Sequence, residues 1–279
     1  MTWAQPSTQT KGMPVGDAEQ TPHPTRRSRR PAKRRRRVSV LGVFGELLIT
    51  LGVLAFLYVG WQLWLGDVIQ GAQKNAAGSE LSQQWEQAAE TASPTPDASA
   101  SPDPTATTET EVPIPVLGQP DDAQAFAIMR VPRWGPDYSV TIAGGVTRAR
   151  TLDPIGIGHY PGTQMPGETG NFAVAGHRTT YGKPFSDIET LRIGDAIVVE
   201  TEAGWYTYRF RTLEYVEPTE TSVLDAVPQM DVAAGDAYIT MTSCSPRWSM
   251  TERIVAYGVF ESFTPREAGP PASLTEGVA

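Results

Sequence analysis

The sequence contains one cysteine, Cys244, among 279 residues, so the chain cannot form an intrachain disulfide. A zinc site with several cysteine ligands and an iron–sulfur cluster held within the chain are excluded for the same reason. Histidine is also scarce, with three residues in all. The hydrophobic share of 40% is nevertheless too high for wholesale disorder, so we expect one or two folded domains.

Positive charge is concentrated at the amino terminus. Residues 1–37 contain ten Lys/Arg and two Asp/Glu, a net charge of +8, whereas the remaining residues contain thirteen and twenty-nine, a net charge of −16. Most of the basic residues lie in the run RRSRRPAKRRRR at 26–37. Such a run is typical of a nucleic-acid-binding arm, but the segment that follows favours a different interpretation.

A long apolar segment follows the basic run. Residues 38–65 contain one charged residue, Glu46, and exceed the roughly 20 residues that a helix needs to cross a bilayer. Because basic flanks stay on the cytoplasmic side, we predict a cytoplasmic tail over 1–37, a retained transmembrane signal anchor over 38–65, and an extracytoplasmic remainder. The protein would then be a single-pass type II protein of the cell membrane. The alternatives are a buried core helix and a cleaved signal peptide, and both fit the length and flanks poorly.

Residues 66–121 are predicted to connect the anchor to a folded domain. Within them, residues 79–90 place Leu81 and Trp85 at helical spacing, which indicates a short juxtamembrane helix. Residues 91–112 are rich in Pro, Ser, Thr and Ala and have almost no large apolar side chains, so we expect a disordered linker. Such a linker would hold the domain at some distance from the membrane.

Residues 122–263 show short strands separated by glycine and proline, a pattern that predicts a mainly β domain with short helices, folded as a closed or nearly closed barrel. The clearest strands are 196–201 and 205–211, a predicted hairpin around Ala203-Gly204 with one buried face. Residues 264–279 are expected to form a flexible tail. The other predicted strands are 126–131, 138–142, 172–175, 238–242 and 254–259, and helical periodicity is limited to 186–191 and 222–227.

Three residues at predicted strand ends carry the candidate chemistry. Cys244 follows one strand, and a free thiol in an oxidising compartment needs a reason to be there, although a lone cysteine is often a small buried hydrophobe. His177 lies at the end of another strand, and Arg253 begins the strand after Cys244. Acyl transfer by a thiol needs a proton donor and acceptor and a positive group for the oxyanion. The pattern therefore predicts a catalytic site of His177, Cys244 and Arg253.

These motifs resemble those of the sortases, membrane-anchored cysteine transpeptidases of Gram-positive bacteria. The resemblance covers about residues 125–261, and Met241 and Ser243 depart mildly from the family's TLxTC-type strand. The segments that carry it are TMTSCSP at 240–246, the following Arg253, GNFAVAGHR at 170–178 and, for the class E enzymes of actinobacteria, residues 158–172 and 177–185.

The resemblance implies an eight-stranded sortase β-barrel over 122–263 and a role for each candidate residue. Cys244 would form a thioester with the threonine carbonyl of a C-terminal sorting signal, His177 would be the general acid/base, and Arg253 would stabilise the oxyanion. The class E similarity implies an LAxTG-like rather than an LPxTG signal. The partners would be secreted proteins with that signal and an amine of a peptidoglycan precursor, with no cofactor and no nucleic acid. His159 matches a non-catalytic position and would hydrogen-bond within a loop.

Three alternatives differ from this interpretation. An L,D-transpeptidase usually shows an SHGC-like motif, whereas Thr242-Ser243 precede Cys244 here. A non-catalytic wall-binding module would bury Cys244 as an inert structural residue. A metal site of His159, His177 and Cys244 is disfavoured because spacings of 18 and 67 residues match no compact ligand motif.

Overall fold

The computed structural model describes residues 39–92, 113–230 and 232–276. The chain divides into two compact units, residues 1–51 and residues 52–279. The predicted cytoplasmic tail over 1–37 and nearly all of the predicted linker over 91–112 lie outside the described residues, so both stay predictions.

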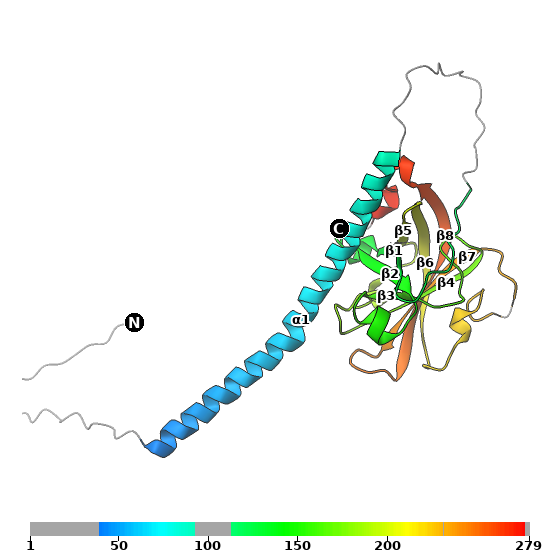
Figure 1. Cartoon of the computed structure of the whole chain (residues 1–279). Coiled ribbons are helices and arrows are strands. Elements are labelled where there is room, and N and C mark those ends of the chain that lie inside the picture. Colours follow the sequence, from blue (N-terminus) through cyan, green and yellow to red (C-terminus); the bar gives the residue numbers. More distant parts are fainter. Residues whose placement is uncertain (1–38, 93–112, 231, 277–279) are drawn as a thin grey trace, which may run out of the picture. The chain divides into compact units, whose positions relative to one another are not determined.

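Eight strands form a closed barrel in the second unit, which confirms the predicted fold class (Figure 1). Their order around the barrel is β1-β2-β3-β4-β7-β8-β6-β5, and β5 closes the ring by pairing with β1. The β2–β3 and β4–β7 pairs are parallel, and the other pairs are antiparallel. The strands are β1 (Ala125–Arg130), β2 (Val140–Gly144), β3 (Ile157–His159), β4 (Gly170–Gly176), β5 (Ala196–Thr201), β6 (Gly204–Val216), β7 (Ala237–Ser245) and β8 (Glu252–Pro265).

Alternating side chains of the strands fill the barrel. Tyr206, Tyr208 and Phe210 of β6 are at most 4% exposed, which confirms the predicted buried face of the β5–β6 hairpin. β3 is not predicted from the sequence, because it is three residues long and has a glycine at its centre. The short helices are η1 (Pro132–Trp134), η2 (Arg148–Leu152), η3 (Ile188–Thr190), η4 (Ser222–Leu224), η5 (Arg266–Ala268) and η6 (Ala272–Thr275), of which η2 is a π-helix and the others are 3-10 helices.

The carboxyl-terminal residues cover the second face of the same hairpin. β8 continues to Pro265, and the buried guanidinium of Arg266 donates to Glu202 O at 2.9 Å and to Glu200 Oε1 at 3.1 Å. Ser273 of η6 shares a hydrogen bond of 3.0 Å with Thr207. The flexible tail expected from residue 264 is therefore wrong for residues 264–275, because this segment buries the outer side of β5 and β6.

One helix, α1 (Val40–Ala92), replaces the predicted anchor and separate juxtamembrane helix. It is long and apolar enough to cross a membrane, and the large apolar side chains described in its first half are exposed. No proline occurs between residues 40 and 92, so nothing in that stretch removes a helical hydrogen bond. The helix predicted over 79–90 is the last part of α1.

The last turns of α1 pack on the barrel in the second unit. Ser82 Oγ donates a hydrogen bond of 2.5 Å to the buried carboxylate of Glu200, and the Arg266 guanidinium lies 5.6 Å from the centre of the Trp85 ring. After the linker, the chain rejoins the barrel at Pro115, whose carbonyl accepts a hydrogen bond of 2.5 Å from the Tyr206 hydroxyl. The chain thus contacts the barrel both before residues 93–112, at Ser82 and Trp85, and after them, at Pro115, while the role of the linker as a tether stays a prediction.

Candidate active site

Strand pairing brings the three candidate residues to one edge of the barrel. β4 and β7 are parallel neighbours with Ala175 opposite Thr242, so His177 and Cys244 each lie two residues beyond a paired position. Next to them, β7 and β8 pair Cys244 directly with Arg253. The three residues, separated by up to 76 positions in the sequence, line one open cavity of about 490 Å³.

The end of β7 is fixed by hydrogen bonds on both sides of the thiol. Ser243 Oγ donates to Gly176 O at 2.7 Å, which ties β7 to the end of β4 just before His177. The buried Arg178 donates from Nη1 to Cys244 O at 3.4 Å and is ion-paired with Glu189. Cys244 itself is partly exposed at the cavity wall, and this exposure disfavours the alternative of a buried structural cysteine.

Two neighbours hold the His177 ring in place. Its Nε2 lies 2.6 Å from Asp153 Oδ1, and its ring stacks on Tyr181 with centroids 5.1 Å apart. Burial, which leaves the His177 side chain 12% exposed, lowers its pKa below the usual value. The hydrogen bond and charge of Asp153 oppose this shift and favour the imidazolium, whereas the cationic groups of Arg148 and Lys74 lower the pKa further.

The Arg253 side chain is held by the turn between β7 and β8. Its Nη1 donates to Met250 O at 3.1 Å and to Glu252 O at 2.9 Å. Among the described residues, neither its Nε nor its Nη2 has a hydrogen-bond partner. The guanidinium is therefore fixed through one nitrogen while two others can donate to a molecule in the cavity.

Asp153, Tyr181 and Arg178 also belong to this site, although no sequence pattern predicts them. Asp153 follows η2 and Tyr181 lies in the loop after His177, where no periodicity marks a functional side chain. Arg178 directly follows His177 in the motif GNFAVAGHR, and that adjacency was the one signal available.

His159 lies outside the cavity. Its side chain is buried and stacked on Phe172 with centroids 5.2 Å apart, and its Nε2 lies 3.1 Å from Gln164 O and 3.0 Å from Thr163 Oγ1. Burial lowers its pKa. Within residues 39–92, 113–230 and 232–276, no group of three or more His, Cys, Asp or Glu side chains is placed to hold a metal ion. His159 is the last residue of β3 rather than a loop residue, and its hydrogen-bond partners lie in the loop that follows.

The arrangement suits one type of chemistry. A partly exposed thiol, an imidazole bonded to a carboxylate, and a guanidinium with free donors share one cavity at the edge of a closed barrel. These are the groups that nucleophilic acyl transfer through a thioester requires. Fold and site together define a β-barrel enzyme of the cysteine acyltransferase type.

Comparison with known proteins agrees with that class. A family model described as the sortase domain matches residues 129–261. The chain is 35% identical over 256 residues to sortase SrtE1 of Streptomyces coelicolor, and the match covers 89% of this chain and 65% of that relative's length. Both matches are to sortases, a family of cysteine transpeptidases.

Solved structures of class E sortases have the same fold. Sortase E from Streptomyces avermitilis is 37% identical with a TM-score of 0.50, and the match covers 55% of this chain and 97% of that chain. Sortase E1 from Streptomyces coelicolor, determined with a tripeptide in the active site, is 35% identical with a TM-score of 0.51, covering 56% of this chain and 99% of that chain. The chain therefore belongs to the sortase family, and its similarity to class E is present in both sequence and structure.

Proposed function

We propose that the protein is a membrane-anchored transpeptidase that joins secreted proteins to an amine of the cell wall precursor. The observation that carries this proposal is the shared cavity of His177, Cys244 and Arg253 at the end of β4 and β7. Membership of the sortase family supports the same reaction.

The proposed reaction has two acyl-transfer steps. The sulfur of Cys244 attacks the threonine carbonyl of a sorting signal, and Arg253 donates hydrogen bonds to the oxyanion. His177 gives a proton to the departing glycine amine, so that the Thr–Gly bond breaks and a thioester remains on Cys244. An amine then attacks the thioester, His177 accepts a proton from it, and the thiolate of Cys244 leaves as the new amide forms.

The walls of the cavity suit an extended peptide with an apolar residue ahead of the cleaved bond. The apolar side chains of Val146, Leu152, Trp248 and Met250 line it together with the three candidate residues. Trp248 and Met250 are 81% and 67% exposed, so they offer apolar surface that a bound peptide would bury. The tripeptide in the active site of sortase E1 supports a peptide ligand at this position.

The class E similarity favours an LAxTG-like signal over LPxTG. The apolar length of α1 supports a membrane anchor, and the basic run before it supports a type II orientation, with the barrel outside the cytoplasm. Substrate proteins would then reach the enzyme during or after secretion.

A peptide assay tests the proposed function. The full chain in detergent micelles is incubated with two quenched peptides that differ only in Ala or Pro at the second position of the signal, with and without hydroxylamine as amine acceptor. We expect faster cleavage of the Ala peptide, a transferred product only with the amine, and a thioester adduct by intact mass. Cys244→Ala should form no adduct, and cleavage by that variant would overturn the proposed mechanism.

A thiol-labelling control separates this function from a binding module. A small alkylating reagent should modify Cys244 in the folded protein and abolish cleavage, because the side chain is partly exposed. Labelling that occurs only after unfolding would favour the inert structural cysteine.

A further inference from the structure

Lys74 of α1 makes an unusual contact with the barrel. Its side chain is buried, with the residue 8% exposed, although a charged ammonium is costly to bury without acceptors. The acceptors are two main-chain carbonyls: Lys74 Nζ donates to Asp153 O at 2.9 Å and to Leu152 O at 3.3 Å. Lys74 therefore fixes the backbone at the end of η2.

That backbone carries the carboxylate that holds the His177 ring. Asp153 accepts the Lys74 hydrogen bond on its main-chain oxygen, while its side-chain Oδ1 lies 2.6 Å from His177 Nε2. Arg148 at the start of η2 lies 3.5 Å from the same Oδ1 but is largely exposed, so the ammonium of Lys74 is the more buried restraint on this segment. A shift of the Asp153 backbone would move the hydrogen bond to His177.

A second contact of α1 reaches the other support of the ring. Tyr181, Gly182 and Lys183 all have positive φ angles, of 53°, 76° and 43°, so the loop that stacks on His177 is conformationally strained at its two non-glycine residues. Gly71 of α1 packs directly on this loop, because a Cβ added at Gly182 would lie 2.8 Å from Gly71 N. α1 thus contacts the loop at its strained turn.

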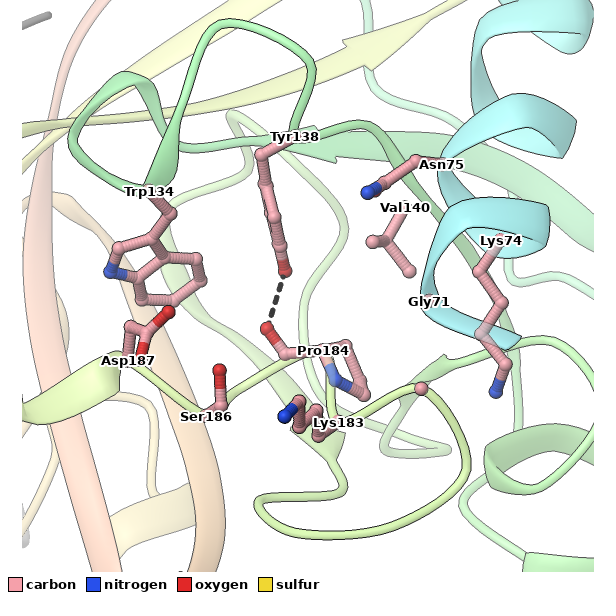
Figure 2. Close-up of a pocket in the computed structure, with 11 residues that line it drawn as sticks. Gly71, Lys74, Asn75, Trp134, Tyr138, Val140, Lys183, Pro184, Ser186 and Asp187 are labelled. Carbon is pink, nitrogen blue, oxygen red and sulfur yellow. Dashed lines mark hydrogen bonds between the residues drawn. The ribbon is translucent and has the colours of Figure 1, made fainter. Parts of the chain in front are cut away.

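Figure 2 shows this junction, with Gly71, Lys74 and Asn75 on one stretch of α1 beside the loop that contains Lys183 and Pro184. A cavity of about 150 Å³ separates them from Tyr138, whose hydroxyl donates to Pro184 O at 2.9 Å. The backbone nitrogen of Ser139 donates to Asn75 Oδ1 at 3.1 Å. The helix is therefore bonded to the barrel on this side as well as through Lys74.

We propose that the juxtamembrane part of α1 is a positioning element for His177, and that Lys74 acts as a positioning residue through Asp153. The proposal rests on the proposed function, because it assigns a task to a helix on behalf of the general acid/base. It predicts that the anchor helix takes part in catalysis without touching the substrate. Lys74 lines the small junction cavity and a neighbouring cavity with Asp153 and Tyr181, and it does not line the cavity that contains Cys244.

A double-mutant cycle tests the route through Asp153. The variants Lys74→Met, Asp153→Asn and their combination are made in the full chain, and kcat and KM are measured with the Ala peptide and saturating hydroxylamine. Because misplacing a reacting group by about 1 Å can cost about 10²-fold, we expect Lys74→Met to lower kcat by about tenfold to 10²-fold. KM should stay within about twofold, because Lys74 does not line the cavity in which the peptide would bind.

The combined variant should be no slower than Asp153→Asn alone, since Lys74 has nothing left to position. Multiplication of the two effects would overturn the route through Asp153, and a rise in KM with unchanged kcat would show that Lys74 acts on peptide binding instead. Lys74→Arg keeps the charge and the N–H donors, so it should lose less kcat than Lys74→Met, although the larger planar guanidinium should not restore kcat in full at this buried site.

Ser82→Ala is the matched control on the same helix. Ser82 bonds to Glu200, which does not line the active-site cavity, so this variant should keep kcat within about twofold of the unchanged protein. An equal loss in Ser82→Ala and Lys74→Met would mean that loose docking of α1, rather than Lys74, is responsible. Should Lys74→Met lower the Tm, all variants are assayed at a temperature well below that Tm, so that only folded protein is compared.

The proposed function and the positioning role of α1 would be contradicted by different results. If the unchanged protein forms no thioester and no transferred product, the proposed function is wrong. If it is active and Lys74→Met has the same kcat, the proposed function stands and the positioning role of α1 is wrong.

Discussion

Arg253 offers the sharpest test of the proposed mechanism, because its geometry separates a structural from a catalytic role. Its Nη1 is held by Met250 O and Glu252 O, which leaves Nε and Nη2 for an oxyanion formed at Cys244 on the paired strand. Removal of one oxyanion donor typically costs about 10²–10³-fold in kcat. We expect Arg253→Ala to slow thioester formation by that factor, with the melting temperature little changed because the side chain is not buried in the core.

Arg253→Lys should recover little of the lost rate. A lysine ammonium is one point charge, and the carbonyls of Met250 and Glu252 that now hold Nη1 would compete for it. The planar guanidinium can satisfy these carbonyls and the oxyanion together, which an ammonium on a flexible stem does poorly.

The assay is single-turnover acylation followed by intact mass, so that only the first chemical step is observed. The enzyme is mixed in excess with the sorting peptide and quenched with acid at a series of times, and the thioester adduct is quantified. Arg192→Ala is the matched control, because Arg192 is exposed and does not line the cavity. Acylation of Arg253→Ala at the unchanged rate would refute the oxyanion role.

Three further predictions concern stability, pH dependence and topology. Glu200 is fully buried and bonded to Arg130, Arg266 and Ser82, so Glu200→Ala should destabilise the barrel by about 3–5 kcal/mol in denaturant unfolding; a loss below 1 kcal/mol would contradict the idea of a buried ionic network. Asp153 favours the imidazolium of His177, so Asp153→Asn should lower the pKa of His177 further. The fall of kcat/KM on the alkaline side, where the imidazolium loses its proton, should therefore begin at lower pH. A shift to higher pH would show that Asp153 does not stabilise the charged ring. Protease added to wall-stripped cells should remove the barrel and leave the Arg-rich tail over 26–37 protected, whereas protection of both would contradict the type II orientation.

The sequence was most informative where local pattern decides structure. The β5–β6 hairpin follows from the alternation of Tyr206, Tyr208 and Phe210, and the pairing of Cys244 with Arg253 follows from a turn between adjacent strands. The proximity of His177 to Cys244 does not follow from a local turn. Their strands, β4 and β7, are parallel neighbours that are joined through a long stretch of chain. Spacing alone does not predict such a pair, and its prediction depended on the position of both residues at strand ends and on the family resemblance.

The docking of α1 could not be predicted from hydrophobic periodicity. The face that meets the barrel carries Gly71, Lys74, Gly78, Ser82 and Trp85, which recur at intervals of three or four residues but are mostly small or polar. A Cβ added at Gly78 would lie 2.2 Å from Ser139 O, so glycine there permits a close backbone approach. An apolar stripe is the usual signal of a packed helix, and this contact works through close approach and buried polar groups instead.

The continuity of α1 also fixes how the barrel is rotated about the axis of the adjoining helical turns. From Leu65, where the predicted span ends, to Lys74 the helix advances about 14 Å and turns through two and a half revolutions, at about 1.5 Å and 100° per residue. Because Lys74 is bonded to the barrel and no proline interrupts residues 65–74, the rotation of the barrel about the helix axis is coupled to the rotation of this helical segment. A turn of this helical segment about its own axis would therefore carry the mouth of the cavity with it, so the direction from which a peptide enters the cavity depends on the helix.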